Sequence, residues 1–389
     1  MSAPSLTLDY AAIKARAVEH ALRSGASAAR IAPAFADEGS RERMRDAFAR
    51  DDFATWPYDE AYAVRASDPE RLLAGARSVI CVAVPYATRR VARRDLRGGR
   101  VSNYAGSADY HRRVRALLAG VAGVVDDAAG AAVTAIACDT RPLAERAFAA
   151  RGGLGWIGKH TNLIAPESGS FVFLGEIVTT LPLPPDTPLK KSCGTCARCV
   201  DACPTRALRG DYTIDASRCI ADLTQRTDGI PRELRPLLGN WVWGCDLCQI
   251  ACPPTQRAGF VDDPASAPLD DEVAEPDLTA LLELRSGEFK RRYAKTAMGW
   301  RGAAVLRRNA AVALGNVKDR SSVSALARAL ESDPHPMVRG HAAWALGRIG
   351  SPSAISALQG RDGVEKDSSV LEEIRTALSS TGGLGACPR

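Results

Sequence analysis

The sequence predicts three consecutive segments of different fold class: an α/β domain over residues 1–188, a two-cluster ferredoxin-like domain over 189–260, and an all-α HEAT-like repeat over 278–389. Two observations predict this division. Eight of the eleven cysteines fall in the middle segment, and a helical pattern after them repeats at a shift of 32 residues. The chain of 389 residues is long enough for two or three domains.

The first segment alternates short apolar runs with helical patterns, which is typical of an α/β domain. Residues 78–87, 133–140 and 171–181 are apolar and rich in β-branched side chains, which predicts buried strands. Residues 109–130 have the apolar spacing of a helix and end in glycine. Residues 141–153 predict a shorter helix with a proline near its first turn and a glycine pair at its end.

The first residues of the chain carry acids where a signal peptide would be apolar. No window of about 18 uninterrupted apolar residues predicts a transmembrane helix. We therefore expect a cytoplasmic protein without a membrane partner. We also expect it to be a monomer. Thiols stay reduced in the cytoplasm, so the clustered cysteines favour metal binding over disulfides.

The cysteines follow the spacing of a ferredoxin with two clusters. The stretch CGTCARCVDACP (193–204) places cysteines two, two and three residues apart with a proline after the last, and CDLCQIACPP (245–254) repeats its second half. Zinc ribbons need only two CxxC pairs. The longer run is the bacterial ferredoxin signature, in which the fourth cysteine crosses to the other cluster. Two zinc sites are the alternative.

The crossing rule assigns the eight cysteines to two [4Fe–4S] clusters. The ligands are Cys193, Cys196, Cys199 and Cys252 for one cluster, and Cys203, Cys219, Cys245 and Cys248 for the other. Cys219 lies 26 residues before Cys245, which departs from a simple ferredoxin. Cys81 lies in an apolar strand and Cys138 ends one, so we expect both in the core. We expect Cys387, in the tail, to be incidental. Paired clusters carry single electrons, but they do not identify the reaction.

The last segment is helical and internally repeated. Residues 308–317 align with 340–349 at a shift of 32, and residues 323–326 align with 355–358 at the same shift. Helix pairs at this period predict a short α-solenoid that is similar to a HEAT repeat. An ordinary pair of helical hairpins is the alternative.

A basic block leads into this repeat. Residues 285–320 contain ten Lys or Arg and two acids, whereas residues 261–277 contain seven acids and no base. A local basic block can bind phosphates. A solvated helical face is the equally simple interpretation of the charge pattern alone.

Four stretches together resemble the epoxyqueuosine reductase family. They are CDTRPLAERAFAARGGLGWIGKHTNLI (138–164), GSFVFLGEI (169–177), the eight cysteines and WGCDLCQIACP (243–253). The resemblance spans nearly the whole chain, with the three segments in the same order. It implies a nitroreductase-like, cobalamin-binding α/β domain and an enzyme that reduces epoxyqueuosine to queuosine in the anticodon loop of tRNA. Electrons would pass from an external donor through the two clusters to cobalamin.

Within this resemblance, Asp139 matches the proposed catalytic proton donor. Removal of the epoxide oxygen takes two electrons and protons, and a protonated oxygen is the better leaving group. A carboxyl group beside an apolar corrin would be desolvated, so we expect its pKa to be raised. Position alone favours a different role, in which Asp139 and Thr140 cap a helix that starts near Pro142.

Further cofactor contacts are implied by the same resemblance. The positions that fall where the family lines its corrin and nucleotide loop are Arg65, Tyr104, Lys159, Asn162, Ser170, Gly244 and Asp246, besides Asp139. Each of them has an alternative as an ordinary surface or turn residue. His160 departs from the family, which has asparagine there. Three tryptophans either flank the corrin or an unpaired base or pack in the core, namely Trp156, Trp241 and Trp243.

The basic block then gains a role in tRNA binding, since cations can bind the phosphates of an RNA loop while a base enters a pocket. The candidates are Lys290, Arg291, Arg292, Lys295, Arg301, Arg307 and Arg308. Two other functions stay open. One is another cobalamin-dependent reductase of the reductive dehalogenase type, and the other is a non-catalytic ferredoxin-type electron carrier.

Overall fold

The computed structural model describes residues 8–89 and 97–382, so the predicted incidental Cys387 lies outside the described residues. The chain divides into two compact units that are not continuous in sequence. The first unit comprises Met1–Thr88, Tyr110–Ser217 and Leu247–Asp263, and the second comprises Arg89–Asp109, Arg218–Asp246 and Pro264–Arg389. The predicted ferredoxin-like segment contributes to both units, and the three-segment division stays a prediction.

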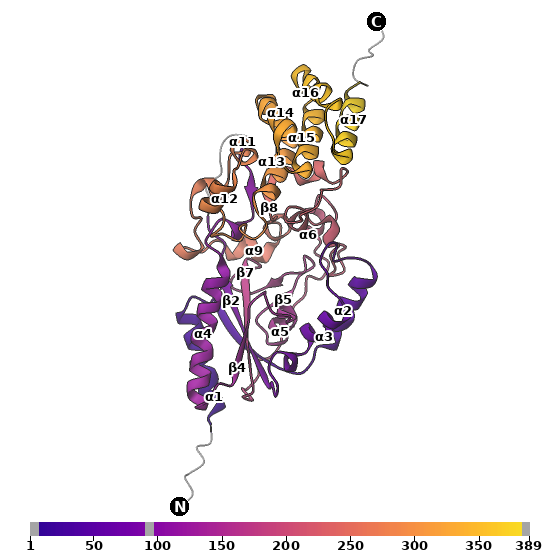
Figure 1. Cartoon of the computed structure of the whole chain (residues 1–389). Helices are drawn as coiled ribbons and strands as arrows, with labels where there is room; N and C mark the ends of the chain where they lie inside the picture. Colours follow the sequence, from indigo (N-terminus) through magenta and orange to yellow (C-terminus); the bar gives the residue numbers. More distant parts are fainter. Residues whose placement is uncertain (1–7, 90–96, 383–389) are drawn as a thin grey trace, which may run out of the picture. The chain divides into compact units, whose positions relative to one another are not determined.

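A four-stranded antiparallel sheet forms the centre of the first unit (Figure 1). In spatial order its strands are β1 (Ala28–Pro33), β2 (Ser78–Pro85), β7 (Val172–Thr179) and β4 (Thr134–Ala137). Three of these strands are those that the apolar runs predict. The short strand β1 was not predicted, because its sequence AARIAP has little of the β-branched character that marks the others.

Both faces of this sheet are covered, and successive residues of β2 point to opposite faces. On one face Val82 packs in a core with helices α1 (Tyr10–Arg23) and α4 (Tyr110–Ala129). On the other face Cys81 packs in a second core with helix α5 (Glu145–Arg151). Cys81 is fully buried, and the prediction that this thiol lies in the core is confirmed. The mixed α/β class of this region is likewise confirmed.

Helix α5 begins later than the sequence predicts. Its first residue is Glu145 and its N-cap is Ala144, which makes no side-chain capping bond. The idea that Asp139 and Thr140 cap this helix is therefore wrong. Cys138 is buried at the end of the neighbouring strand, as predicted. The other elements of the first unit are α2 (Glu38–Ala49), α3 (Glu60–Ser67), β5 (Trp156–Ile157), β6 (Leu163–Ile164), α6 (Arg198–Asp201), α8 (Leu247–Ile250) and α9 (Pro253–Ala258).

The second unit combines a two-stranded parallel ladder with the helical repeat. The ladder joins β3 (Arg100–Val101) to β8 (Trp241–Trp243). The helices are α7 (Ile220–Leu223), α10 (Asp271–Ala274), α11 (Leu278–Leu282), α12 (Ser286–Arg292), α13 (Ala303–Val317), α14 (Val323–Ser332), α15 (Pro336–Ile349), α16 (Pro352–Asp362) and α17 (Ser368–Gly382). Within the described ranges, no helix of the chain combines the length and apolarity needed to cross a membrane.

Two glycines at the 32-residue shift explain how the repeat stacks. A Cβ atom at Gly315 of α13 would lie 2.9 Å from the Cα of Ala345 in α15. A Cβ atom at Gly347 of α15 would lie 2.6 Å from the Cβ of Ala377 in α17. Both distances are too short for real atoms, so glycine at these positions lets each helix approach the next. The repeated sequence ALG is thus a helix–helix contact.

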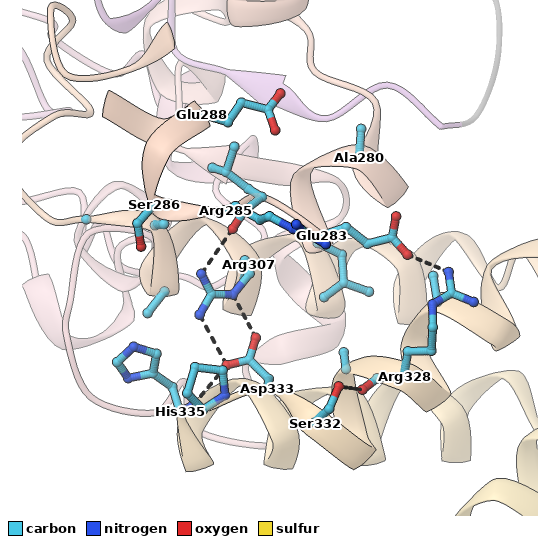
Figure 2. Close-up of a pocket in the computed structure, with 18 of the residues that line it drawn as sticks. Ala280, Glu283, Arg285, Ser286, Glu288, Arg307, Arg328, Ser332, Asp333 and His335 are labelled. Carbon is cyan, nitrogen blue, oxygen red and sulfur yellow. Dashed lines mark hydrogen bonds and ion pairs between the residues drawn. The ribbon is translucent and has the colours of Figure 1, made fainter. Parts of the chain in front are cut away.

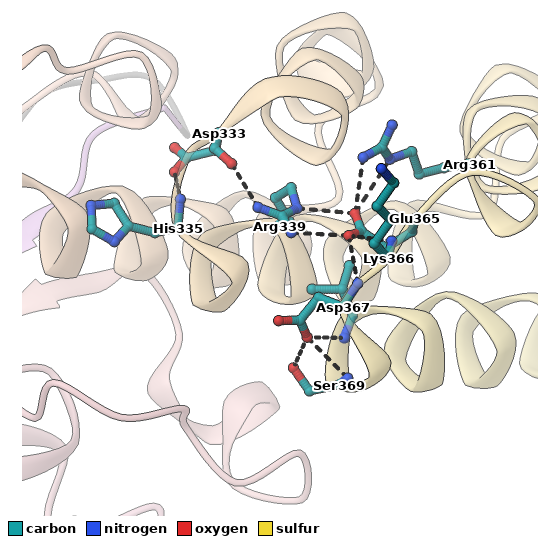
Figure 3. A network of polar contacts seen from close by, with 9 residues as sticks. Asp333, His335, Arg339, Arg361, Glu365, Lys366, Asp367 and Ser369 are labelled. Carbon is teal, nitrogen blue, oxygen red and sulfur yellow. Dashed lines mark hydrogen bonds and ion pairs between the residues drawn. The ribbon is translucent and has the colours of Figure 1, made fainter.

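Equivalent ion pairs also recur at this shift. Arg307 Nε lies 2.7 Å from Asp333 Oδ2, and 32 residues later Arg339 Nη2 lies 2.9 Å from Glu365 Oε1. Figure 3 shows that Arg361 and the turn after α16 complete the network around Glu365. The Glu365 side chain is only 2% exposed. Burial opposes its ionisation, but donors that include Arg339 outweigh burial and lower the pKa of Glu365 to about 2.

We expect Glu365→Gln to destabilise the protein by up to about 3 kcal/mol at neutral pH. The folded-state pKa lies below the ordinary value of 4.5, so the ionised carboxylate is favoured by folding. This stabilisation is complete above the ordinary pKa and is lost as the pH falls toward 2. The free energy of unfolding, measured by denaturant titration from pH 7 to pH 2.5, should therefore converge for the two proteins at low pH. A constant difference would contradict this account.

Candidate functional site

A cavity of about 210 Å³ in the first unit is lined by four cysteines. They are Cys193, Cys196, Cys199 and Cys252, the set that the crossing rule assigns to one cluster. Cys252 comes from a segment separate from the other three, so the tertiary fold brings it to them. Four sulfurs around one small cavity suit an iron–sulfur cluster. The ligand assignment stays a prediction, and this arrangement supports it.

The buried cysteine thiols of this cavity favour the binding of a positively charged iron–sulfur core. Burial raises the pKa of the thiols of Cys199 and Cys252, and the neighbouring Cys193 adds to the shift of both. Thiolates crowded in one cavity repel each other, so without metal they retain protons. Iron would displace these protons and neutralise the charge. The donor set therefore fits the group.

Short turns place the four sulfurs. The Cys196 amide donates to the Cys193 carbonyl at 3.0 Å, and Gly194 between them has a φ of +51°. Cys199 lies in α6, and Cys252 is the N-cap of α9, whose first residue is proline. Proline suits a first helical turn because its missing amide hydrogen would have no partner there. This explains the proline after the last cysteine of the motif.

The other four predicted ligands are divided between the two units. Cys203 and Cys248 belong to the first unit, and Cys219 and Cys245 belong to the second. The Cys203 sulfur lies 3.6 Å from the Thr205 hydroxyl, and Cys219 is the N-cap of α7. Their assignment to a second cluster stays a prediction from spacing.

Two aromatic side chains also line the four-cysteine cavity, namely Trp156 and His160. The cysteine spacing gave no sign of either. His160 is 2% exposed, and burial lowers the pKa of its ring to about 4. Trp241 and Trp243, by contrast, are buried in the second unit.

Asp139 lies in the loop after strand β4, where α4 reaches it. His111 Nε2 lies 3.1 Å from Asp139 Oδ2, and the Tyr110 hydroxyl donates to the same oxygen at 3.3 Å. The Asp139 side chain is 61% exposed. Its backbone has a left-handed φ of +56°, and its amide donates to Glu145 Oε1 at 2.6 Å. The loop therefore exposes the carboxyl group of Asp139, while the hydrogen bond of the Asp139 amide with Glu145 holds the backbone in place.

The protein's own groups do not produce the expected rise in the pKa of Asp139. The hydrogen bond with His111 is the largest influence and lowers this pKa, although partial burial acts in the opposite direction. Desolvation alone would raise this pKa, and the sequence does not indicate a contact with a histidine from a segment 28 residues earlier. Tyr110 and His111 are thus site residues that sequence reasoning missed.

Stacked rings adjoin this carboxyl group. His111 stacks on Tyr110 at 4.1 Å between ring centroids, Tyr110 on Phe173 at 4.0 Å, and Phe173 on Tyr86 at 4.4 Å. Tyr110 and Phe173 are nearly parallel, with 5° between their planes. The rings form a stack beside the acid, in which Tyr86 is buried and the other three rings are half-buried.

Two further carboxyl groups lie behind Asp139. Burial raises the pKa of Glu145 to about 7 and raises that of Glu176 well above its usual range. Glu176 is fully buried on β7, and neither of its carboxylate oxygens has a partner among the described residues. A buried carboxyl group without a partner is stable only when protonated. Glu176 therefore stays neutral in the core, whereas Glu145 accepts a hydrogen bond from the Asp139 amide.

We expect Glu145→Ala to loosen the Asp139 loop, because it removes the acceptor of the Asp139 amide. Loss of a hydrogen bond worth about 1–1.5 kcal/mol predicts roughly tenfold faster exchange of that amide hydrogen. Glu145→Gln keeps an acceptor oxygen and should exchange at a rate near that of the parent. Hydrogen exchange of residues 138–142 measures the effect, with the exposed Glu167→Ala as a control. Equal exchange in all variants would show that Glu145 does not hold the loop.

The other predicted corrin contacts are not all accessible. Arg65 is exposed, and Lys159 and Asn162 are half-buried in the first unit. Ser170 is buried, its hydroxyl lying 2.9 Å from that of Thr255. The structure gives each of these residues a surface or structural position, and a corrin contact stays a prediction.

Three more of these positions belong to the second unit. Asp246 is buried and accepts a hydrogen bond from the Asn103 amide at 2.7 Å. The Tyr104 hydroxyl accepts from Trp243 Nε1 at 3.1 Å. Gly244 has a φ of +64°, so a turn requires it. Each residue stabilises the loops of its own unit.

The structure contradicts the predicted tRNA contact of Arg308 and gives Arg307 an acidic partner. Arg308 is fully buried and donates to the carbonyls of Asp228 and Leu223, so it cannot reach a phosphate. Burial lowers its pKa to about 9. Arg307 is engaged by Asp333 and has a side chain only 10% exposed. A basic pattern in sequence does not tell a solvated cation from one that anchors loops.

The remaining cations of the block are more accessible. Arg292 is bound to Glu288 at 3.1 Å and its side chain is 27% exposed. Arg301 lies over the ring of the exposed Trp300, 3.6 Å from its centroid. The exposed cations of α12 and the turn after it are Lys290, Arg291 and Lys295. These stay candidates for RNA contact.

A groove of about 960 Å³ runs along the same unit (Figure 2). Two of its arginines are paired with acids, Arg307 with Asp333 and Arg328 with Glu283. Arg285 is exposed and also lines the groove. The groove therefore has both charges on its walls, and the cations of α12 lie in the segment that follows Arg285.

Family models match three parts of the chain. Residues 66–140 match a model described as epoxyqueuosine reductase QueG, residues 192–255 a 4Fe-4S double cluster binding domain, and residues 301–379 HEAT repeats. Among curated relatives, the epoxyqueuosine reductase of Bacillus anthracis is 37% identical over 82% of this chain and 85% of its own length. That of Listeria monocytogenes is 34% identical over 94% of this chain and 97% of its own.

Solved structures agree with these matches. A crystal structure of epoxyqueuosine reductase with a tRNA-Tyr epoxyqueuosine-modified stem loop has a TM-score of 0.90 and 31% identity, over 96% of this chain and 100% of that one. A structure of the Bacillus subtilis epoxyqueuosine reductase, in which an aspartate catalytic loop is swung out of the active site, has a TM-score of 0.88 and 31% identity, with the same coverage.

Proposed function

The chain belongs to the epoxyqueuosine reductase family, and on this premise we propose that it reduces epoxyqueuosine to queuosine in the anticodon loop of a tRNA, using two [4Fe–4S] clusters and cobalamin. It is an oxidoreductase with a double-cluster domain. The observation that carries the finer proposal is a four-cysteine cavity and an accessible, backbone-held carboxyl group in one unit.

The reaction replaces an epoxide by a carbon–carbon double bond and releases its oxygen as water, so it consumes two electrons and two protons. Asp139 is the proposed donor of a proton to the departing oxygen. His111 and Tyr110 fix the orientation of this carboxyl group through its Oδ2 atom. Because the His111 bond lowers the pKa of Asp139, a protonated Asp139 requires a less aqueous surrounding than the open site provides.

The aromatic stack beside Asp139 can contact an apolar ring system. The stack of His111, Tyr110 and Phe173 offers aromatic faces and edges to an apolar ring system, and closure of such a ligand over it would exclude water from the carboxyl group. Cobalamin, when bound, supplies a reduced metal that can open the epoxide, and the clusters supply single electrons. Arg65, Lys159 and Asn162 remain the proposed donors to its polar groups. Their side chains are not fully buried.

We expect Arg291→Ala with Lys295→Ala to weaken tRNA binding about tenfold at low salt and to reduce the slope of log affinity against log salt by about 1.4–1.8. Both residues are exposed and would each release a counterion on contact with a phosphate. Fluorescence anisotropy with an anticodon stem loop at several salt concentrations measures this. A matched control is Arg16→Ala with Arg23→Ala, two exposed cations of α1. An unchanged slope would remove this segment from the RNA interface.

Turnover decides the proposal as a whole. The protein is reconstituted anaerobically with iron, sulfide and cobalamin, reduced, and mixed with tRNA that carries epoxyqueuosine. Conversion to queuosine, detected by mass spectrometry of the released nucleosides, is the expected result. Corrin binding without conversion would favour a cobalamin-dependent reductase of another substrate class, and the absence of corrin binding would favour an electron carrier.

A further inference from the structure

Two buried N–H groups in the four-cysteine cavity have no partner within the described ranges 8–89 and 97–382. They are the indole Nε1 of Trp156 and the ring Nε2 of His160, and both residues line the cavity. A buried donor without a partner is destabilising, and nearly all buried polar groups in proteins are satisfied. These two N–H groups therefore need a hydrogen-bond acceptor that the described residues do not supply.

The hydrogen-bond pattern of His160 makes its Nε2 a donor. Its Nδ1 accepts a hydrogen bond from the Asn162 amide at 3.3 Å. A neutral imidazole has one donor and one acceptor nitrogen, so the hydrogen resides on Nε2. A protonated ring would set Nδ1–H against an amide hydrogen. The indole nitrogen of Trp156 can only donate, so both unmatched groups are donors.

The backbone holds the histidine ring against this cavity. A Cβ atom at Gly158 would lie 2.9 Å from His160 Cε1 and 3.1 Å from its Nε2. Glycine at 158 therefore gives the ring edge the room that it needs. The ring is 2% exposed and cannot turn its nitrogen to solvent.

The remaining wall of the cavity restricts the choice of acceptor. Besides the cysteines and the two aromatic residues, it consists of Ile164, Ser192, Arg198, Pro253 and Pro254. Arginine is a donor only, and isoleucine and proline side chains offer no acceptor. The Ser192 hydroxyl is the one side-chain acceptor of these five, and it already accepts from the Gly194 amide at 3.4 Å. Sulfur is therefore the acceptor that the cavity presents in quantity, and a cluster adds its own sulfides to the four cysteine sulfurs.

We propose that Trp156 and His160 donate hydrogen bonds to the sulfurs of the cluster bound by Cys193, Cys196, Cys199 and Cys252, and that these bonds make this cluster easier to reduce. The inference rests on the proposed ligand set. Reduction adds one electron from the donor, forms or breaks no bond and moves no proton, since both hydrogens stay on nitrogen. Donors stabilise the reduced cluster more than the oxidised one because its sulfurs carry more negative charge.

The test is a potentiometric titration of the reconstituted holoenzyme, followed by electron paramagnetic resonance. Trp156→Phe and His160→Leu each remove one donor, and His160→Asn keeps an amide N–H near the same place. At the potential where half of this cluster is reduced in the parent, the ratio of reduced to oxidised cluster should fall roughly three- to tenfold for each of the first two variants. The ratio should fall less for His160→Asn than for His160→Leu. It should not change for Trp300→Phe, which replaces an exposed residue.

A spectroscopic readout separates a hydrogen bond from a packing effect. In protein labelled with [15N]histidine, the reduced cluster should show a nitrogen coupling that His160→Leu abolishes. The signal of this cluster is identified as the one that disappears in Cys252→Ser. Unchanged ratios in both donor variants, or an absent coupling, would overturn the inference and assign the two donors to water.

The failure of this inference differs from a failure of the proposed function. If Cys252→Ser keeps all of its iron, the ligand set is wrong. If the set is right and the potentials do not move, only the donor role fails. Turnover on tRNA is measured separately and enters neither outcome.

Discussion

Asp139→Asn is expected to lower the turnover of epoxyqueuosine-containing tRNA by about 10²–10⁴-fold, the usual contribution of a positioned general acid. Asparagine has nearly the same shape and can still accept from His111 and Tyr110, which contact the Asp139 carboxylate. It has no acidic proton to deliver. The loss should therefore appear in the rate constant of a single turnover with pre-reduced enzyme, while the affinity for tRNA stays that of the parent.

The exposure of the Asp139 side chain makes this a clean substitution, because 61% of it contacts solvent and little packing is lost. Glu145→Gln provides the control at the backbone, since it keeps the acceptor for the Asp139 amide. Iron content and melting temperature should match those of the parent in both variants. Turnover of Asp139→Asn within threefold of the parent would assign proton delivery to another group.

The sequence could predict those ligands of the site that are set by the spacing of nearby cysteines. Three of the cysteines that line the cavity lie within seven residues, Cys193 to Cys199, and the rule of the crossing fourth ligand points to Cys252. The strands β2, β4 and β7 were predictable for a similar reason. Their apolar, β-branched character is a property of each short segment.

What the sequence could not predict depends on tertiary packing. The basic pair Arg307 and Arg308 looks like a phosphate-binding pair, yet one residue pairs with Asp333 and the other holds the carbonyls of Leu223 and Asp228. The contact of His111 with Asp139 joins helix α4 to a loop after β4. No spacing rule connects such segments, so the lowered pKa of Asp139 could not be predicted from the sequence.

The roles of the buried polar groups in the helical repeat also could not be predicted from the sequence. Arg308 of α13 and His341 of α15 lie at nearly equivalent positions, and His341 Nε2 accepts from the Ile230 amide at 3.1 Å. Both residues hold the loop between α7 and β8 in the same unit. The repeat thus stabilises its own unit through polar residues that charge counting would place on an outer, RNA-binding face.

Cys252→Ser is expected to remove one cluster, so that iron falls from about eight to about four atoms per chain. Serine is nearly isosteric, but its hydroxyl is a poor ligand for iron beside three thiolates. Cys252 closes the cavity from a segment apart from the other three cysteines, and no other described cysteine lines that wall. Its loss should leave the second cluster in place and interrupt electron transfer, so turnover should fall at least about a hundredfold.

Two variants make this prediction specific. Cys81→Ser removes a thiol that is buried in the core of the first unit, away from the cavity, and should keep all of the iron. Cys203→Ser should also leave about four irons, but should spare the resonance signal that Cys252→Ser abolishes, because the crossing rule places the two cysteines on different clusters. If both variants abolish the same signal, the ligands do not cross, and Cys203 belongs with the cysteines of the cavity.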